Sequence, residues 1–305
     1  MSHEAVEDRR ARLESMSLTD GPLDTYAPNA TVMDELEFRS VGGEWIPTAA
    51  RRRRHTALLD TWRADSSNPP RDRQAILFAG PPAAGKSTLM DGHLTERRRV
   101  DADDFKELLL RSARASGTLE MLLPEPLRHT LSEDFHPLEL SALVHHESMI
   151  LYQRALNDAI RAGENIAIDG TLGHKPWARK LTEQLRTFGY KIHVIDVEAT
   201  QELSLTRIVA RWRAGYENAV ADPHDPEAAM GGRWLPASAV TRHFTAGQDY
   251  SDCEVNARDI ANGLREVVRY DLYRASVDAI APKHEQSYAK NSSGEWTDKL
   301  VGPDR

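Results

Sequence analysis

Short apolar runs alternate with helical patterns through the middle of the chain. The runs are rich in strand-forming residues and end abruptly, which is typical of buried strands in a parallel sheet. The predicted strands are residues 74–79, a short one around Val100, 165–169, 190–197 and 266–272. The predicted helices are residues 138–162, 176–188, 200–214 and 236–247, with another beginning near Lys86. Strands and helices in this alternation predict an α/β fold, a parallel sheet with helices on both faces.

The two ends of the chain are more polar than the middle. Apolar residues at helical spacing predict a helix over residues 48–64, within a polar and mostly helical lead-in. Turn-forming residues at 65–70 predict a linker, and residues 215–235 predict a mobile loop. From residue 281 the chain is polar and expected to be loose. We therefore expect a helical N-terminal extension at 1–72, an α/β domain at 73–275 and a polar tail at 276–305.

Composition narrows the class of protein. The 305 residues are 40% hydrophobic and 28% charged, which is ordinary for a soluble globular chain. No apolar run is long enough to span a bilayer, and the start resembles no secretory signal, so we expect a cytoplasmic protein without membrane contact. The single cysteine, Cys253, suits that compartment. A net charge of −8 argues against nucleic acid as the main partner, and the four arginines at 51–54 are more often a solvated helix face.

The strongest motif lies between the strand at 74–79 and the helix that begins near Lys86. Residues 80–87, GPPAAGKS, fit the phosphate-binding pattern G-x4-G-K-[ST]. In such a loop successive backbone N–H groups surround the phosphates, the lysine neutralises the β and γ oxygens, and the serine ligates Mg²⁺. We expect nucleotide contacts from Gly80, Pro81, Pro82, Ala83, Ala84, Gly85, Lys86, Ser87 and Thr88.

Carboxylates follow two of the predicted strands. Asp101, Asp103 and Asp104 come after the short strand at Val100, where a carboxylate can accept a proton from an attacking hydroxyl. A solvated acidic turn explains them equally well, and Asp104 points away from Asp103 if the segment is extended. Asp169, in Asp169-Gly-Thr171, can hold Mg²⁺ or its waters, with Thr171 close to ligand; the alternative is a tight turn.

Two further groups of side chains suit a transfer reaction. Glu147 falls on the apolar face of the helix at 138–162, which indicates either acceptor binding or a structural ion pair. Arg207, Arg211 and Arg213 lie on the helix after Thr200, and Arg233 lies in the predicted mobile loop. Phosphoryl transfer needs mobile positive charge over the transferred group. Taken singly, each arginine is more often surface charge.

Together the motifs resemble the zeta-toxin family of phosphate-loop kinases. The matching pieces run from residue 74 to 247; they are GPPAAGKS, VDADDFK, HHES, IAIDGTL, RWR and GRWLP. The resemblance implies the three-layer fold of those kinases and makes Asp103 the general base. It places the two lid arginines at Arg211 and Arg233, which with Asp103 and Lys86 form the expected catalytic set. From the residues themselves we also expect substrate contacts from Glu147, Asp169 and Thr171, and a Mg²⁺ held by Ser87 and Asp169.

The function implied by this resemblance is an ATP-dependent kinase. Its acceptor is a sugar hydroxyl of a nucleotide-sugar of the UDP-N-acetylglucosamine type, and its toxicity is neutralised by a small antitoxin protein. The sequence departs from the family at Ala83, where glycine is usual, and in an extra segment at 111–136. Two alternatives stay open: a metabolic kinase acting on a nucleoside or dinucleotide, and a nucleotide-binding switch without kinase activity.

Overall fold

The computed structural model describes residues 3–64, 68–124, 135–248, 250–291 and 293–298. The chain divides into two compact units, each built from three stretches of sequence. The first, which we call the helical unit, comprises Met1–Asp65, Ala102–Gln153 and Ile208–Ala237. The second, which we call the sheet unit, comprises Ser66–Asp101, Arg154–Arg207 and Ser238–Arg305.

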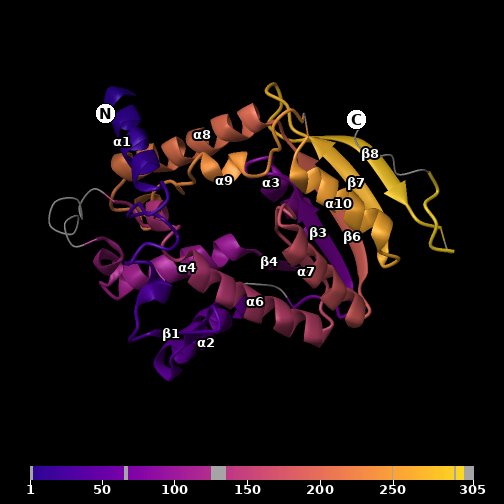
Figure 1. The fold of residues 1–305 in the computed structure, drawn as a ribbon, viewed down its shortest axis with the longest axis horizontal. Coiled ribbons are helices and arrows are strands. Elements are labelled where there is room, and N and C mark those ends of the chain that lie inside the picture. The colour runs from indigo at the N-terminus through magenta and orange to yellow at the C-terminus, as the bar shows by residue number, and fades with distance from the viewer. Residues whose placement is uncertain (1–2, 65–67, 125–134, 249, 292, 299–305) are drawn as a thin grey trace. The chain divides into compact units, whose positions relative to one another are not determined.

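The sheet unit contains a six-stranded sheet with the strand order β4-β5-β3-β6-β7-β8 (Figure 1). Its strands are β3 (Gln74–Ala79), β4 (Arg98–Val100), β5 (Ile166–Ile168), β6 (Lys191–Glu198), β7 (Val267–Arg274) and β8 (Lys283–Ala289). The first five in this order are parallel, and β8 pairs antiparallel with β7. β3 lies between β5 and β6, with Ala75 opposite both Ile166 and Ile192. The predicted parallel sheet is therefore confirmed.

Helices cover the sheet and explain why its central strands are apolar on both faces. They are α3 (Lys86–Met90), α7 (Lys175–Thr187), α9 (Ser238–Thr241) and α10 (Asp252–Gly263), with the later part of α6 (His145–Ala162) and the first part of α8 (Gln201–Ala221). α7 and α10 both pack against β6 (Figure 1). Ile76, Phe78, Ile195 and Val197 are almost completely buried in a core cluster that also contains Met90 of α3 and Leu203 of α8. A continuous apolar strand is what such two-sided burial requires.

The helical unit is assembled around helices and one hairpin. Its elements are α1 (His3–Met16), β1 (Phe38–Val41), β2 (Glu44–Pro47), α2 (Ala49–Ala64), α4 (Ala102–Ala115), the first part of α6 and the rest of α8. Short 3₁₀ turns complete it at Thr31–Met33, Leu119–Leu122, Pro137–Leu140 and Ala228–Met230. β1 and β2 are joined by Gly42 and Gly43, whose φ angles of 61° and 82° suit a tight hairpin turn.

Several sequence-based boundaries need correction. The expected loose end from residue 281 contains β8, and α10 was not predicted. α8 continues to Ala221, into the expected loop, because Tyr216 and Ala219 remain buried beyond residue 214. The long helix begins at His145 rather than 138, and the helix expected at 236–247 is reduced to Ser238–Thr241. Residues 65–67 of the predicted linker and 125–134 of the extra segment lie outside the described residues.

The length and composition of each helix show whether it could cross a membrane. Among the residues that the structure describes, no helix combines the length and the apolar composition needed to cross a bilayer.

Candidate functional site

The phosphate-binding motif directly follows β3, the strand at which the sheet changes direction. β3 pairs with β5 on one side and with β6 on the other, and all three strands are parallel. The chain runs from β3 to β4 and back to β5 on one side, and then crosses to β6 on the other side. In open α/β sheets this change of direction opens a crevice at the carboxyl ends of the strands. The sequence motif is therefore placed where such a fold binds ligands.

Two glycines of the motif are required by the shape of the loop. Gly80 has a φ of 120°, and a Cβ there would lie 1.8 Å from the carbonyl oxygen of Val197. Gly85 has a φ of 106°, and its Cβ would lie 2.6 Å from the Pro282 ring. Ala83, where the family usually has glycine, adopts a φ of 60°. This left-handed conformation is costly for alanine, so the loop keeps the expected backbone at the expense of local strain.

Lys86 is held inside the loop it belongs to. Its side chain is 9% exposed, and Nζ donates hydrogen bonds to the carbonyl oxygens of Gly80 at 2.8 Å and Pro81 at 2.9 Å. Ser87 and Thr88 follow on α3 and are exposed to solvent. The loop therefore presents a fixed ammonium group and two accessible hydroxyl groups at one strand end.

The end of β5 lies against the phosphate loop. The Gly80 N–H donates to the Thr171 carbonyl at 3.1 Å, and the Asp169 N–H donates to the Val100 carbonyl at 3.0 Å. Asp169 and Thr171 are both half-buried. The structure thus brings these two predicted residues to the same sheet edge as the phosphate loop.

The available donors suit a magnesium ion that is bound partly by its nucleotide. Within the described residues no group of three or more His, Cys, Asp or Glu side chains could hold a metal ion. Mg²⁺ commonly binds through one or two protein oxygens, water and substrate phosphates, so an all-protein cage is unnecessary. The exposed Ser87 hydroxyl and the half-buried Asp169 carboxylate fit that requirement.

Arg207 has a role that the sequence did not reveal. Its guanidinium donates to the carbonyl oxygens of Ala83 and Ala84 at 3.5 Å, and to those of Ser276 at 3.0 Å and Ala279 at 3.2 Å. It therefore ties the phosphate loop to the connection between β7 and β8. No local pattern marks this contact, because its partners are backbone carbonyls far away in the sequence.

Two buried side chains lie behind the β5 end of the site. A Cβ at Gly173 would be 2.2 Å from His243 Nδ1 and 3.3 Å from Cys253 Sγ. Burial, together with the positive charges of Arg242 and Lys86, lowers the pKa of His243 to about 4, so its imidazole is neutral at neutral pH. Burial raises the pKa of the Cys253 thiol well above its usual range. Cys253 is therefore an unreactive thiol packed against the site.

A pair of buried carboxyl groups lies along β6. Asp196 and Glu198 are 0% and 2% exposed. Asp196 accepts a hydrogen bond of 2.6 Å from the Tyr270 hydroxyl, and Glu198 accepts one of 2.7 Å from the Ser251 hydroxyl. Burial raises the pKa of Asp196 to about 6 and moves that of Glu198 well upward. The pair therefore keeps a proton at pH values where a carboxyl group exposed to water would be ionised.

From this pair of carboxyl groups we predict that the free energy of unfolding falls as the pH rises. Because the folded-state pKa of Asp196 exceeds its unfolded value of 3.8, folding favours the protonated form, and that stabilisation is lost between about pH 4 and 6. Asp196→Asn should therefore raise the free energy of unfolding by on the order of 1–3 kcal/mol relative to the parent at pH 8 but not at pH 4, and raise the thermal midpoint accordingly. Thermal scans of both proteins across this range test it. Parallel stability–pH curves would contradict the assignment.

In the helical unit, Asp103 lies in a cluster of positive charge. It is in the first turn of α4, so the assumption of an extended segment was wrong and the alternation of Asp103 and Asp104 does not apply. Lys106 Nζ lies 3.0 Å from the Asp103 carboxylate, and Arg233 forms an ion pair with it. Burial alone would raise the pKa of Asp103, but Lys106, Arg233 and Arg211 outweigh it and hold that pKa far below its usual range.

Within the helical unit Asp103 is thus paired with Arg233, and the charge of Arg211 contributes to lowering its pKa. The roles of base and lid arginines that the resemblance implies stay predictions. The neighbouring Asp101 instead accepts a hydrogen bond of 2.6 Å from Arg99 within the sheet unit. An ionised carboxylate beside two guanidinium groups can orient a hydroxyl and can face a phosphoryl group.

Glu147 forms a buried ion pair in the helical unit. Its carboxylate is fully buried and accepts a hydrogen bond of 2.6 Å from Arg51 on α2. His55 Nε2, one turn along α2, lies 2.7 Å from the same carboxylate. Burial alone would raise the pKa of Glu147, but these two partners lower it. This arrangement favours the structural ion pair between the two sequence-based interpretations; the acceptor-binding role stays a prediction.

Replacing Glu147 separates the two interpretations. Breaking a buried pair leaves Arg51 with an uncompensated charge, so we expect Glu147→Gln to lower the free energy of unfolding by about 3 kcal/mol. Denaturant titration measures this, with Glu183→Gln as a control because Glu183 forms an exposed ion pair with Arg186. An acceptor KM that rises while stability stays parental would instead support acceptor binding.

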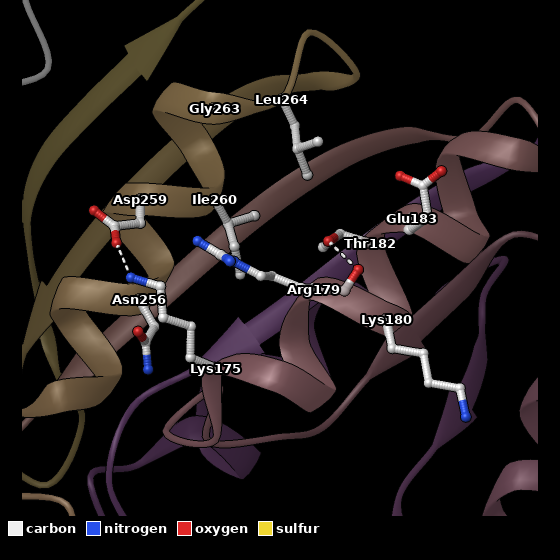
Figure 2. Close-up of a pocket in the computed structure, with 10 residues that line it drawn as sticks. All are labelled: Lys175, Arg179, Lys180, Thr182, Glu183, Asn256, Asp259, Ile260, Gly263 and Leu264. Atoms are coloured by element: carbon white, nitrogen blue, oxygen red, sulfur yellow. Dashed lines mark hydrogen bonds and ion pairs between the residues drawn. The ribbon is translucent and has the colours of Figure 1, made fainter.

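A separate pocket lies between α7 and α10 in the sheet unit. It has a volume of about 530 Å³ and is lined by residues that include Arg179, Lys180, Ile260 and Leu264. Figure 2 shows Lys175 and Asp259 joined across its edge by an ion pair. None of the predicted site residues lines this pocket. The candidate site residues are consequently those of the motifs at the strand ends in the sheet unit and, separately, those around Asp103 in the helical unit.

Comparison with solved structures shows the fold. The AvrRxo1-ORF1:-ORF2 complex with ATP matches with a TM-score of 0.53 and 18% identity over 82% of this chain and 70% of that chain. The same complex with sulphate ions matches with a TM-score of 0.52, at the same identity and coverage. A structure from the PezAT toxin–antitoxin system of Streptococcus pneumoniae has a TM-score of 0.46 at 16% identity, over 76% of this chain and 82% of that one.

Comparison with protein sequences gives the family. No curated protein matches the chain. The family model described as Zeta toxin matches residues 59–278, which include the phosphate loop, Asp103, Asp169, Arg211 and Arg233. Because this match covers well over half of the chain, the protein belongs to the zeta toxin family.

Proposed function

We propose that this protein is an ATP-dependent kinase that transfers the γ-phosphate to a sugar hydroxyl of a nucleotide-sugar of the UDP-N-acetylglucosamine type. The observation that carries the proposal is the phosphate loop at the carboxyl end of β3. Its glycines adopt conformations that only glycine fits, and its lysine is already fixed inside the loop. This loop lies in a segment that matches the zeta toxin family.

The phosphate loop binds ATP as a substrate. Its backbone N–H groups surround the phosphates, and Lys86 exchanges its contacts with the Gly80 and Pro81 carbonyls for the β and γ oxygens. Ser87 and Asp169 would hold Mg²⁺, which neutralises charge on the phosphates when bound. The structure of AvrRxo1-ORF1:-ORF2 that shares this fold was solved with ATP, which supports the assignment.

Asp103 serves as the base for the acceptor hydroxyl. A sugar hydroxyl is a poor nucleophile at neutral pH, so its proton must be accepted as the bond to phosphorus forms. The cationic surroundings of Asp103 keep its carboxylate ionised and therefore able to accept a hydrogen bond from that hydroxyl. Arg211 and Arg233 stabilise charge on the transferred group, and Thr171 contacts substrate.

The proposal includes toxicity and a small antitoxin partner. Membership of the zeta toxin family supports a toxin. The AvrRxo1 structures that share the fold contain two proteins, ORF1 and ORF2, which supports a protein partner for this chain. Expression without a partner should therefore stop cell growth, and we place the active protein in the cytoplasm, where its substrates are made.

The acceptor can be identified directly. The purified protein is incubated with Mg²⁺, ATP and a pool of cellular metabolites, and mass spectrometry shows which species gains a phosphate. Phosphate on a nucleotide-sugar supports the proposal. Phosphate on a nucleoside or dinucleotide replaces the proposed acceptor, and a pool that gains none argues for a nucleotide-binding switch.

A further inference from the structure

The N-terminal helix α1 lies outside the segment that matches the family, yet it contributes a buried charge to the helical unit. Arg9 is 7% exposed, and its guanidinium pairs with Glu139, which is fully buried. Arg9 Nε donates to Glu139 Oε1 at 2.9 Å. The guanidinium carbon also lies 4.8 Å from the centre of the Tyr216 ring. A buried arginine with both partners in place is well ordered, because few other positions would satisfy its charge.

Glu139 extends this contact to the helix that carries Arg211. Its Oε1 accepts a second hydrogen bond, from Trp212 Nε1 at 3.0 Å. Trp212 directly follows Arg211, is fully buried, and stacks on Tyr216 with ring centroids 5.5 Å apart. The α1 arginine therefore holds the turn of α8 from which Arg211 projects.

The segment that carries Arg233 is held by the same elements. A Cβ at Gly232 would lie 1.9 Å from the Trp212 carbonyl oxygen, so this segment packs backbone to backbone on α8. Trp234 contacts the Trp212 ring edge-on, at 5.4 Å between centroids, and donates to the Ser17 hydroxyl at 2.9 Å. Gly232 and Trp234, the residues on either side of Arg233, are thus held in place by packing and hydrogen bonding.

A further contact ties this segment to α1 itself. The Ala237 N–H donates to the Glu14 carboxylate at 3.1 Å. On the opposite end of α1, Glu7 pairs with Arg213 on α8. Glu7 and Glu14 lie about two turns apart on one helix, so α1 contacts both arginine-bearing segments.

We propose that Arg9 is a positioning residue for phosphoryl transfer: through Glu139 and Trp212 it holds Arg211 and Arg233 in the geometry that the transferred group requires. The inference rests on the proposed function of these two arginines. It assigns the polar N-terminal helix a part in turnover, because small errors in the placement of charged groups cost large factors in rate.

The test compares Arg9→Ala with Arg12→Ala, an exposed arginine on the same helix. At a temperature where thermal scans show both variants folded, Arg9→Ala should lower kcat by about tenfold or more while the KM for ATP changes by less than about twofold. Arg12→Ala should behave as the parent. A kcat that is unchanged, or that rises as it would on relief of an inhibitory contact, would overturn the proposal.

A triple variant distinguishes positioning from general loss of structure. If Arg9 acts through the two lid arginines, adding Arg9→Ala to the double variant Arg211→Ala/Arg233→Ala should lower kcat by less than about twofold beyond that double variant alone. Multiplicative losses would overturn the proposal. If Arg9→Ala fails to fold, Ser17→Ala removes only the hydroxyl that Trp234 contacts, and the same cycle is measured with it.

Hydrogen exchange gives a readout that does not require activity. Arg9→Ala should speed exchange of backbone amides in residues 209–217 and 231–237, and leave those of β3 at the parental rate. Unchanged exchange in both segments would overturn the proposal whatever the kinetics show. A parent protein that transfers no phosphate would refute the proposed function, while the exchange result would still decide whether α1 holds these segments.

Discussion

Lys86→Ala should abolish phosphoryl transfer almost completely and leave the sheet unit folded. The loss follows because no other group in the loop supplies a cation to the β and γ oxygens, and removal of one such group costs roughly 10²- to 10³-fold in rate. The fold should survive because Nζ bonds only backbone carbonyls at a strand end, which water can reach once the side chain is shortened.

The measurement is acceptor phosphorylation by mass spectrometry beside a thermal scan of the same sample. Lys180→Ala is the matched control, since Lys180 is an exposed lysine of the same unit on α7 and lines the separate pocket. Transfer by Lys86→Ala within about twofold of the parent would contradict the nucleotide-binding role of the loop, which is expected to contribute far more than that.

Asp103→Asn should bind ATP and acceptor almost as the parent does, lose most phosphoryl transfer and no longer be toxic on expression. Asparagine keeps the shape of the side chain but cannot take a proton. Arg233 keeps an acidic neighbour in this variant, because its Nη2 lies 3.6 Å from Glu107. We therefore expect the loss to appear in turnover rather than in folding.

Calorimetry of ATP binding and mass spectrometry of the acceptor together test this prediction. Because the pKa of Asp103 is held far below its usual range, its carboxylate should stay ionised throughout the usual assay range, and kcat/KM should show no loss from this group between pH 8 and pH 5. Full activity in Asp103→Asn, with loss in Asp101→Asn or Asp169→Asn instead, would move the base to another residue.

The central strands could be predicted because burial on both faces requires apolar residues at neighbouring positions, and this pattern is visible in the sequence. β3 is a continuous apolar run after Gln74, and β6 is apolar at Ile192, Val194, Ile195 and Val197; each was located within two residues. β8 could not be predicted in this way, since Lys283–Ala289 is almost entirely exposed and its strand conformation comes from pairing with β7. The hairpin of β1 and β2 did carry a signal, the Gly42-Gly43 pair, which is typical of a tight hairpin turn.

The chemistry of the site was readable where residues act through a short motif. Lys86, Ser87 and Asp103 were located from local patterns, although their roles remain predictions. Their supporting partners were not readable, because Arg51 pairs with a residue 96 positions away and Arg9 with one 130 positions away. Such pairs are selected by tertiary packing: the apolar neighbours of Glu147 marked it as a residue that needs a partner, but no local pattern identified Arg51 as that partner.

The inert state of Cys253 makes the chain suited to site-specific labelling. It is the single cysteine, it is fully buried, and its thiol stays protonated at neutral pH, so the parent protein should give a blank reaction with maleimide dyes. Val277 is 83% exposed in the connection that Arg207 ties to the phosphate loop. A fluorophore on Val277→Cys would therefore report nucleotide arrival without removal of any native thiol.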